Sequence, residues 1–232
     1  MKQGKKWIFK IAFIFSVCLV GILESKAVSL NAGTKYTYKK EFSYQTIPKS
    51  VKKRMMGRSY KKNRNIKLSD LRYVKVLHYG YDGKIRKGEI VVNKKIAKKT
   101  VKIFYELYQK KYPIQKMKLI DNYEASDNKS MRDNNTSAFN YRKISGSSSL
   151  SRHARGMAID LNPRINPWVK GKKVSPSNGK VYKQRNVKKC KGRYRKNMIH
   201  KNDIAYKIFK KYGFRWGGDW KSYKDYQHFE HK

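Results

Sequence analysis

The sequence predicts an α+β fold that contains a small antiparallel sheet, and two patterns along the chain carry this prediction. Residues 71–81 alternate in polarity and are rich in β-branched and aromatic side chains, and residues 88–93 form a second such run after an Asp-Gly turn signal. Residues 96–108 and 202–212 each repeat apolar side chains at helical spacing. We therefore expect a pair of strands accompanied by two amphipathic helices.

The chain is long enough for one ordinary domain with extensions, since it has 232 residues of which 39% are hydrophobic. Residues 28–65 show neither a helical nor an alternating period, so we expect a basic linker or loose extension there. The domain is expected over residues 66–232. Within it we expect a strand at 116–123, a long polar loop around a short helical stretch at 124–150, and a strand and turn in the aromatic tail at 214–232.

The chain carries a large excess of positive charge, with 58 Lys and Arg against 15 Asp and Glu and a formal net charge of +43. The basic residues are spread along the chain, which predicts a diffuse positive surface. Such a surface suits adhesion to an anionic polymer, either nucleic acid or phosphate-rich teichoic acid, or to an acidic wall or membrane surface. A solvated lysine-rich exterior without a specific partner explains the same composition, so charge alone does not choose among these.

Export is predicted from residues 1–27. Four lysines come first, an apolar run follows over residues 11–23, and Ser25 and Ala27 stand at the positions that a signal peptidase reads. The apolar run is shorter than the about 20 residues that a membrane-spanning helix needs, so we favour a cleaved signal over an uncleaved anchor. The mature chain would then keep Cys190 as its one cysteine, which excludes an intrachain disulfide.

Two short segments concentrate side chains that bind metal ions. The first is SRHARGMAID at residues 151–160, and the second is DYQHFEH at residues 225–231. A catalytic zinc ion needs three nitrogen or oxygen ligands and an open fourth position. His153, Asp160 and His228 can supply this set.

The spacing within these segments suggests how the ligands meet and which residue assists them. A loop residue such as His153 and a strand residue such as Asp160 converge if Gly156 turns the chain between them. Asp225 stands three residues before His228, within reach of a water at the metal, so we expect it to be the general base. In the alternative interpretation, Asp160 caps a turn and His228 is an ordinary surface or core residue.

Other candidate side chains are expected to be structural. Glu230 and His231 form a rival ligand set, but a residue three positions after His228 on one strand points to the opposite face. Two histidines have no carboxylate partner at informative spacing, and two tryptophans match the pattern of buried packing beside a small sheet. These four residues are His78, His200, Trp216 and Trp220.

Taken together, the motifs resemble those of a known group of zinc peptidases. The pattern S-x-H-x-x-G-x-A-x-D matches residues 151–160, D/E-x-x-H-F-E matches residues 225–230, and G-F-x-W-G-G-x-W matches residues 213–220. Over about residues 115–232, the chain is similar to the D-alanyl-D-alanine carboxypeptidases, the dipeptidases and the L-alanyl-D-glutamate endopeptidases of that group.

The resemblance implies a hedgehog/DD-peptidase-like α+β domain with a four-stranded antiparallel sheet and flanking helices. It also implies one Zn²⁺ held by His153, Asp160 and His228, with the acidic residue Asp225 activating water. Stem peptides of peptidoglycan are the implied substrates.

The sequence departs from the group's pattern at two places. Many members carry Glu where Asp225 stands, and the usual Tyr-Arg-Ser segment corresponds here to residues 122–126, which lack the arginine. A cation is still needed to stabilise an oxyanion or to bind a substrate carboxylate. Arg142 and Arg132, both in the Asn- and Ser-rich stretch at residues 131–142, are the candidates nearest in sequence.

The sequence-based hypothesis is a secreted, zinc-dependent D-alanyl-D-alanine carboxypeptidase. An endopeptidase of the L-alanyl-D-glutamate type and a non-catalytic basic protein that binds the wall or nucleic acid are the alternatives. For the peptidase we expect a monomer that binds peptidoglycan stem peptides, with anionic wall polymers as further partners of its basic surface and no nucleic acid. We expect it to be secreted or wall-associated, or held at the membrane by an uncleaved leader.

Overall fold

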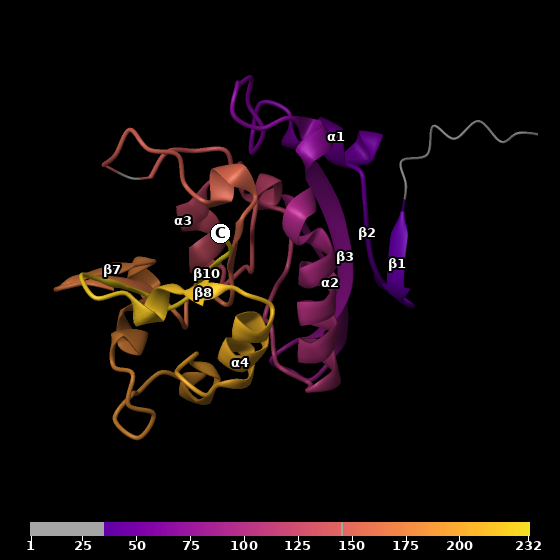
Figure 1. The fold of residues 1–232 in the computed structure, drawn as a ribbon. Helices are drawn as coiled ribbons and strands as arrows, with labels where there is room; N and C mark the ends of the chain where they lie inside the picture. Colours follow the sequence, from indigo (N-terminus) through magenta and orange to yellow (C-terminus); the bar gives the residue numbers. More distant parts are fainter. Residues whose placement is uncertain (1–34, 145) are drawn as a thin grey trace, which may run out of the picture. The chain divides into compact units, whose positions relative to one another are not determined.

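The structure, a computed structural model, describes residues 35–144 and 146–232 of the chain (Figure 1). The predicted leader at residues 1–27 lies outside the described residues. Within the described ranges, no helix combines the length and the apolar character that crossing a membrane requires. Cys190 is buried and has no disulfide partner in the part of the chain that the structure describes.

The segment expected as a loose extension is folded. It forms strands β1 (Tyr36–Lys39) and β2 (Phe42–Gln45) and helix α1 (Lys49–Met55). Phe42 and Val51 are buried in these elements. The sequence did not reveal them because elements of four to seven residues are too short to show a period. The folded region therefore begins well before the boundary expected at residue 66.

The N-terminal sheet has four antiparallel strands in the order β1-β2-β3-β4. Strands β3 (Leu71–Tyr79) and β4 (Ile85–Asn93) form a hairpin whose register runs from the pair Leu71–Asn93 to the pair Tyr79–Ile85. The predicted hairpin is thus confirmed. Strand β2 pairs with the other edge of β3, as Figure 1 shows.

Two amphipathic helices cover the core, as predicted. Helix α2 (Lys94–Gln109) begins at Asn93, whose side chain accepts a hydrogen bond from the backbone N–H of Lys95 at 3.0 Å. Helix α4 (Ile204–Lys211) is capped in the same way by Asp203. The two helices contact each other, and α2 lies against β3 (Figure 1). The largest fully buried side chains of the core they share are aromatic: Phe42, Phe104, Phe209, Phe214 and Phe229.

A second sheet joins segments that are distant in sequence. Its order is β5 (Ala158–Asp160), β10 (His228–Glu230) and β8 (Arg215–Trp216), all antiparallel. Ser137 adds an isolated antiparallel bridge to Asp160 on the free edge of β5. The four-stranded sheet implied by the resemblance is therefore three strands and a bridge at this place, and the sheet with four full strands is the N-terminal one.

The remaining elements are short. A third sheet has the order β7 (Lys173–Ser175), β6 (Trp168–Lys170) and β9 (Lys224–Asp225). The described residues also form one further α-helix and several 3₁₀ helices. These are α3 (Asp127–Arg132), η1 (Leu68–Asp70), η2 (Ile120–Tyr123), η3 (His153–Arg155), η4 (Ser177–Lys183), η5 (Arg195–Asn197) and η6 (Gly217–Asp219).

The strand expected at residues 116–123 is not formed. Lys116 makes only an isolated bridge to Asn135, and the end of the segment folds as η2. The backbone of Lys118 is bonded by a side chain, because its N–H donates to Oδ1 of Asn135 at 2.8 Å and its carbonyl accepts from Nδ2 at 3.0 Å. The side chain of Asn135 thus makes the hydrogen bonds that a neighbouring strand would make. The pattern of apolar residues could not indicate this substitution.

Gly156 ties the two main sheets together. It ends η3 with a φ of 66°, in the left-handed region that glycine tolerates. Its carbonyl accepts a hydrogen bond from the backbone N–H of Asn93 at 2.8 Å, and the Asn93 side chain donates to the carbonyl of Arg155 at 3.1 Å. A Cβ at position 156 would lie 2.7 Å from the nitrogen of Asn93. Both backbone conformation and space therefore require glycine here.

We expect Gly156→Ala to lower the free energy of unfolding by more than Gly83→Ala does. Gly83 has a φ of 73°, and a Cβ added there would have no atom within 4 Å, so alanine meets only the backbone penalty of about 1 kcal/mol. At Gly156 the clash with Asn93 adds to that penalty, for a total of about 2–4 kcal/mol. Urea unfolding of both variants measures the difference, and equal losses would show that the close approach is unimportant.

Candidate metal centre

Three side chains from the two motif segments meet at one point. Nε2 of His153 lies 3.2 Å from Nδ1 of His228 and 3.3 Å from Oδ1 of Asp160. Nδ1 of His228 lies 3.1 Å from the same Asp160 oxygen. Tetrahedral zinc with bonds of about 2.0 Å to nitrogen and oxygen separates its ligands by about 3.3 Å. The three residues, all buried, therefore fit one zinc ion.

Local structure explains how these ligands meet. His153 lies on η3, and the left-handed turn at Gly156 leads the chain directly into β5, where Asp160 is the last residue. His228 begins β10, and the register of the sheet places it opposite Asp160. The predicted turn at Gly156 between a loop ligand and a strand ligand is confirmed.

Each histidine has a partner that leaves the correct nitrogen free for a metal. Nδ1 of His153 donates to the carbonyl of Ala138 at 2.6 Å, so its Nε2 carries the lone pair. Nε2 of His228 lies 3.4 Å from Oε2 of Glu230, which favours a lone pair on Nδ1. These two outer partners orient the rings toward the same point.

Glu230 is held in place by two arginines. Its Oε1 accepts from Arg215 at 2.7 Å, and its Oε2 lies 3.8 Å from Nε of Arg152. Considered from the sequence as part of a rival ligand set, Glu230 instead lies behind the ring of His228. His231 is separate from the site, since its Nε2 is 2.7 Å from Nζ of Lys99.

The buried charges of the ligands depend on one another. Burial opposes ionisation of Asp160, but His153 and His228 outweigh it and hold the pKa of Asp160 far below its usual range. Burial acts to lower the pKa of His228, but its hydrogen bonds to Asp160 and Glu230 raise that pKa to about 10. In the absence of a metal, a proton on His228 thus balances the buried carboxylate.

Asp225 is a second carboxylate beside the three ligands, and its side chain is partly buried. Its Oδ1 is buried and has no hydrogen-bond partner among the described residues. Burial raises the pKa of Asp225 to about 6, against the attraction of His228 and with the help of the nearby charge of Asp160. A Cβ at Gly217 would lie 2.9 Å from Cβ of Asp225, so the glycine allows the two segments to approach. Such a carboxylate has the character of a general base near neutral pH.

The two arginines proposed from the sequence have partners away from the three ligands. Arg142 forms an ion pair with Asp127, while Arg132 donates to Oγ of Ser177 at 2.8 Å. The backbone carbonyl of Arg142 accepts from the N–H of Ser151, which places residue 142 beside the segment that carries His153. Among the described residues, neither guanidinium is bonded to a ligand, so their roles stay predictions.

The polar loop contributes to the site in a way that the sequence did not show. Its amides are buried and bond the backbone of neighbouring segments: Asn134 accepts from Arg164, Asn135 holds Lys118, and Asn140 donates to the carbonyl of Ala125. These bonds position Ser137 and Ala138 beside β5 and His153. The dense run of asparagines was the available signal for this scaffold.

Trp216 lies in the core, whereas Trp220 lies beside the metal centre. Trp216 is buried and donates from Nε1 to the carbonyl of Tyr226 at 2.8 Å, in agreement with the expected packing role. Trp220 is partly exposed, and the centre of its ring system lies 5.3 Å from that of His228. It therefore borders the metal centre, which agrees with the less favoured expectation that a tryptophan lines the substrate cleft.

Comparison with known proteins supports a peptidase. A family model described as D-alanyl-D-alanine carboxypeptidase matches residues 145–231, which contain all three ligands and Asp225. The resemblance inferred from the motifs is thus confirmed over that segment, and peptidases of this family depend on zinc. Searches of curated proteins and of solved structures gave no significant match.

We expect metal binding to release a proton at neutral pH. With its pKa raised to about 10, His228 is protonated in the metal-free protein, and an ion must displace that proton. Affinity for Zn²⁺ should therefore increase with pH, by up to about tenfold per pH unit below that pKa. Calorimetry in buffers of different ionisation enthalpy measures the released protons. An affinity that is independent of pH would contradict the proton on His228.

Glu230→Gln should weaken Zn²⁺ affinity by about 10–100-fold, because outer partners of ligating histidines have effects of this size. Glu89→Gln is the matched control, since Glu89 forms a similar part-buried ion pair with Arg54 and has no contact with the metal centre. Competition with a chromogenic chelator measures both affinities, and thermal unfolding confirms that both variants fold. If the two variants bound Zn²⁺ with equal affinity, Glu230 would have no role in metal binding.

Proposed function

We propose that this protein is a zinc-dependent peptidase of bacterial peptidoglycan and that it acts as a D-alanyl-D-alanine carboxypeptidase. One observation carries the proposal: ligand atoms of two imidazoles and a carboxylate lie within 4.8 Å of one another, with a second, partly buried carboxylate beside them. Three ligands that leave a coordination position open are typical of catalytic zinc, whereas structural zinc sites are closed by four. The family match over residues 145–231 agrees with this choice.

The residues of the site support a mechanism for hydrolysis of a peptide bond. Zinc, when bound, polarises the scissile carbonyl and makes water a stronger nucleophile at neutral pH. Asp225 accepts a proton from the attacking water as the new C–O bond forms. The same carboxyl group then donates that proton to the leaving nitrogen, the C–N bond breaks, and a carboxylic acid and an amine are released.

The choice of a terminal bond depends on recognition of the substrate's free carboxylate. A cation beside the metal centre would supply it, and Arg142 is the better placed of the two candidates because its backbone is bonded to Ser151. Its guanidinium pairs with Asp127, so a substrate carboxylate would have to share or replace that partner. An endopeptidase acting at L-alanyl-D-glutamate bonds is the second candidate, and it would not require this cation.

Action on peptidoglycan requires the protein to leave the cytoplasm. The leader at residues 1–27 has the three parts of an export signal, and the family is one that acts on the cell wall. We therefore propose a secreted or wall-associated protein. A non-catalytic basic binder is the other class, and it would be indifferent to the loss of Asp225.

We expect a chelator to abolish release of D-alanine from a stem pentapeptide and added Zn²⁺ to restore it. His153→Ala should lose both metal and activity, because it removes one of three ligands. Asp225→Asn should keep the metal but lose activity about 10²–10⁴-fold, the usual contribution of a general base. Metal analysis and mass spectrometry of the products measure these effects.

Asp70→Asn is the matched control, since Asp70 pairs with Lys94 at the surface and should leave activity unchanged. Internal cleavage of the stem peptide would favour the endopeptidase. Full activity of metal-free protein would refute the mechanism, and a folded, zinc-loaded protein without any hydrolysis would favour the binder.

A further inference from the structure

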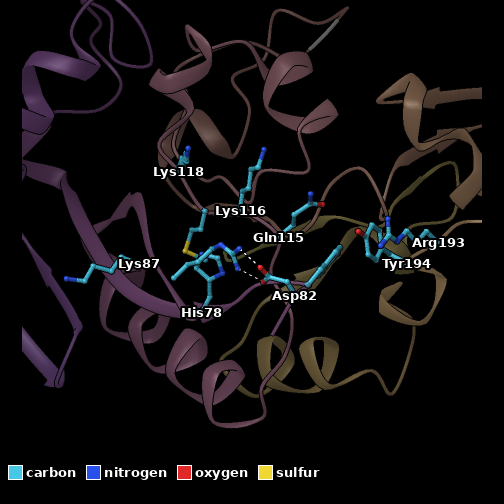
Figure 2. Close-up of a pocket in the computed structure, with 11 residues that line it drawn as sticks. His78, Asp82, Lys87, Gln115, Lys116, Lys118, Arg193 and Tyr194 are labelled. Atoms are coloured by element: carbon cyan, nitrogen blue, oxygen red, sulfur yellow. Dashed lines mark hydrogen bonds and ion pairs between the residues drawn. The ribbon is translucent and has the colours of Figure 1, made fainter. Parts of the chain in front are cut away.

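A cavity separate from the metal ligands opens at the end of the β3–β4 hairpin. Figure 2 shows its wall, which is built from the hairpin, from residues 115–118 and from residues 193–194. Its volume is about 480 Å³, which is within the range of cavities that bind small molecules. None of the three metal ligands nor Asp225 lines it, so the peptidase mechanism leaves this cavity without a role.

The wall of the cavity is strongly positive. Four cations that line it are Lys87, Lys116, Lys118 and Arg193. A fifth, Arg86, is paired with Asp82 through two hydrogen bonds of 2.6 and 2.7 Å, drawn in Figure 2. Asp82 is the only carboxylate among the described residues that line the cavity. Since that charge is neutralised by Arg86, the other cations form a positive field.

Most of these cations lack a strong partner within the protein. The nearest carboxylate to Lys87 is Glu41 at 3.8 Å, and the lysine side chain is 74% exposed. In the described part of the chain, Lys118 and Arg193 form no ion pair, while Lys116 pairs with Asp133. Figure 2 shows Lys87, Lys118 and Arg193 on separate parts of the wall, so a polymer with repeated anionic groups could contact them in turn without breaking an existing close ion pair.

The cavity wall is preformed. The Arg86–Asp82 pair lies against the backbone of Gly80, where a Cβ would be 1.8 Å from Nη1 of Arg86. On another wall, the side-chain carbonyl of Gln115 accepts from Asn134 at 2.8 Å and from Arg164 at 3.3 Å. These contacts fix the shape without using the free cations. An anion would thus meet an organised wall, while the exposed cations would still have to be ordered on binding.

The aromatic residues of the cavity disfavour a nucleic acid as the ligand. Proteins that bind single strands stack bases on free aromatic faces. Here the rings of Tyr81 and Tyr194 pack on each other with centroids 4.5 Å apart, and the guanidinium of Arg193 lies 5.4 Å from the centroid of Tyr194. Phosphate groups without bases fit the available chemistry better.

We propose that this cavity binds the phosphodiester groups of an anionic wall polymer, a chain of polyol phosphates. The choice of the wall as the source rests on the proposed function, whereas the anion site rests on the cavity and its charges. Binding there retains the protein at the wall while the metal centre remains free for stem peptides. Arginine and lysine side chains spread along the wall provide the recognition by contacting successive phosphates of the polymer.

The test uses the full mature chain and a triple variant, Lys87→Gln with Lys118→Gln and Arg193→Gln. All three side chains are exposed, so the fold should be kept. The control triple, Lys52→Gln with Lys53→Gln and Lys62→Gln, removes the same charge from exposed positions outside the cavity. The probes are poly(glycerol phosphate) and single-stranded DNA with the same number of phosphates, titrated at several salt concentrations.

We expect the cavity triple to bind poly(glycerol phosphate) at least about tenfold more weakly than the control triple does and to show a salt dependence shallower by about two to three ions. Hydrolysis of a soluble stem peptide should be the same in both triples. Chemical shifts of amides at residues 115–118 and 193–194 should move when inorganic phosphate is added to the unaltered protein.

Three results would overturn the proposal. Equal loss of binding in both triples would mean that adhesion is spread over the whole basic surface. Preferential binding of DNA would assign the cavity to nucleic acid, and absence of binding to either polymer would remove the anion site. Because binding is measured without catalysis, failure of the peptidase assay leaves this result independent.

Discussion

The pairing of β10 with β5 is the interaction on which the site depends. It places His228 opposite Asp160, although 68 residues separate them in the chain. A shift of one residue in this register would turn the side chain of His228 to the other face of the sheet. The same pairing sets Glu230 opposite Ala158, on the face of β10 that carries His228. A short strand pair thereby fixes a ligand, its neighbouring ligand and its outer partner together.

Burial also limits which charges the site can hold. Asp160 and the Oδ1 atom of Asp225 are both buried, and the charge of Asp160 makes ionisation of Asp225 less favourable. Uncompensated carboxylates in such a place are costly, so the site needs positive charge from His228 or from a metal ion. The hydrogen bond to His228 lowers the pKa of Glu230 most, and the nearby charges of Arg215 and Arg152 lower it further, so Glu230 stays ionised as the acceptor of His228. Both the negative charge of the site and the arrangement of its ligands therefore favour a bound cation.

The features that could be predicted from the sequence are those that depend on residues close together in the chain. The hairpin, helices α2 and α4, and the convergence of His153 with Asp160 follow from local periods and a glycine turn, and the structure agrees with them. The strands before residue 66 and the asparagine that replaces a strand beside Lys118 rest on contacts between distant segments. Local patterns carry little information about such contacts. The role of Glu230 was missed for the same reason, since it requires the register of β10 and the two arginines.

The hydrogen bonds of Asn93 and Ala138 determine which fragment of the chain would keep an intact metal centre. The segment that matches the peptidase family begins at residue 145, yet the acceptor for His153 lies at Ala138 and the donor to Gly156 lies at Asn93. A fragment cut to the matched segment would keep every ligand but lose the groups that orient His153 and hold its turn. The span of the shared motif and the span of the autonomous folding unit therefore do not coincide in this protein.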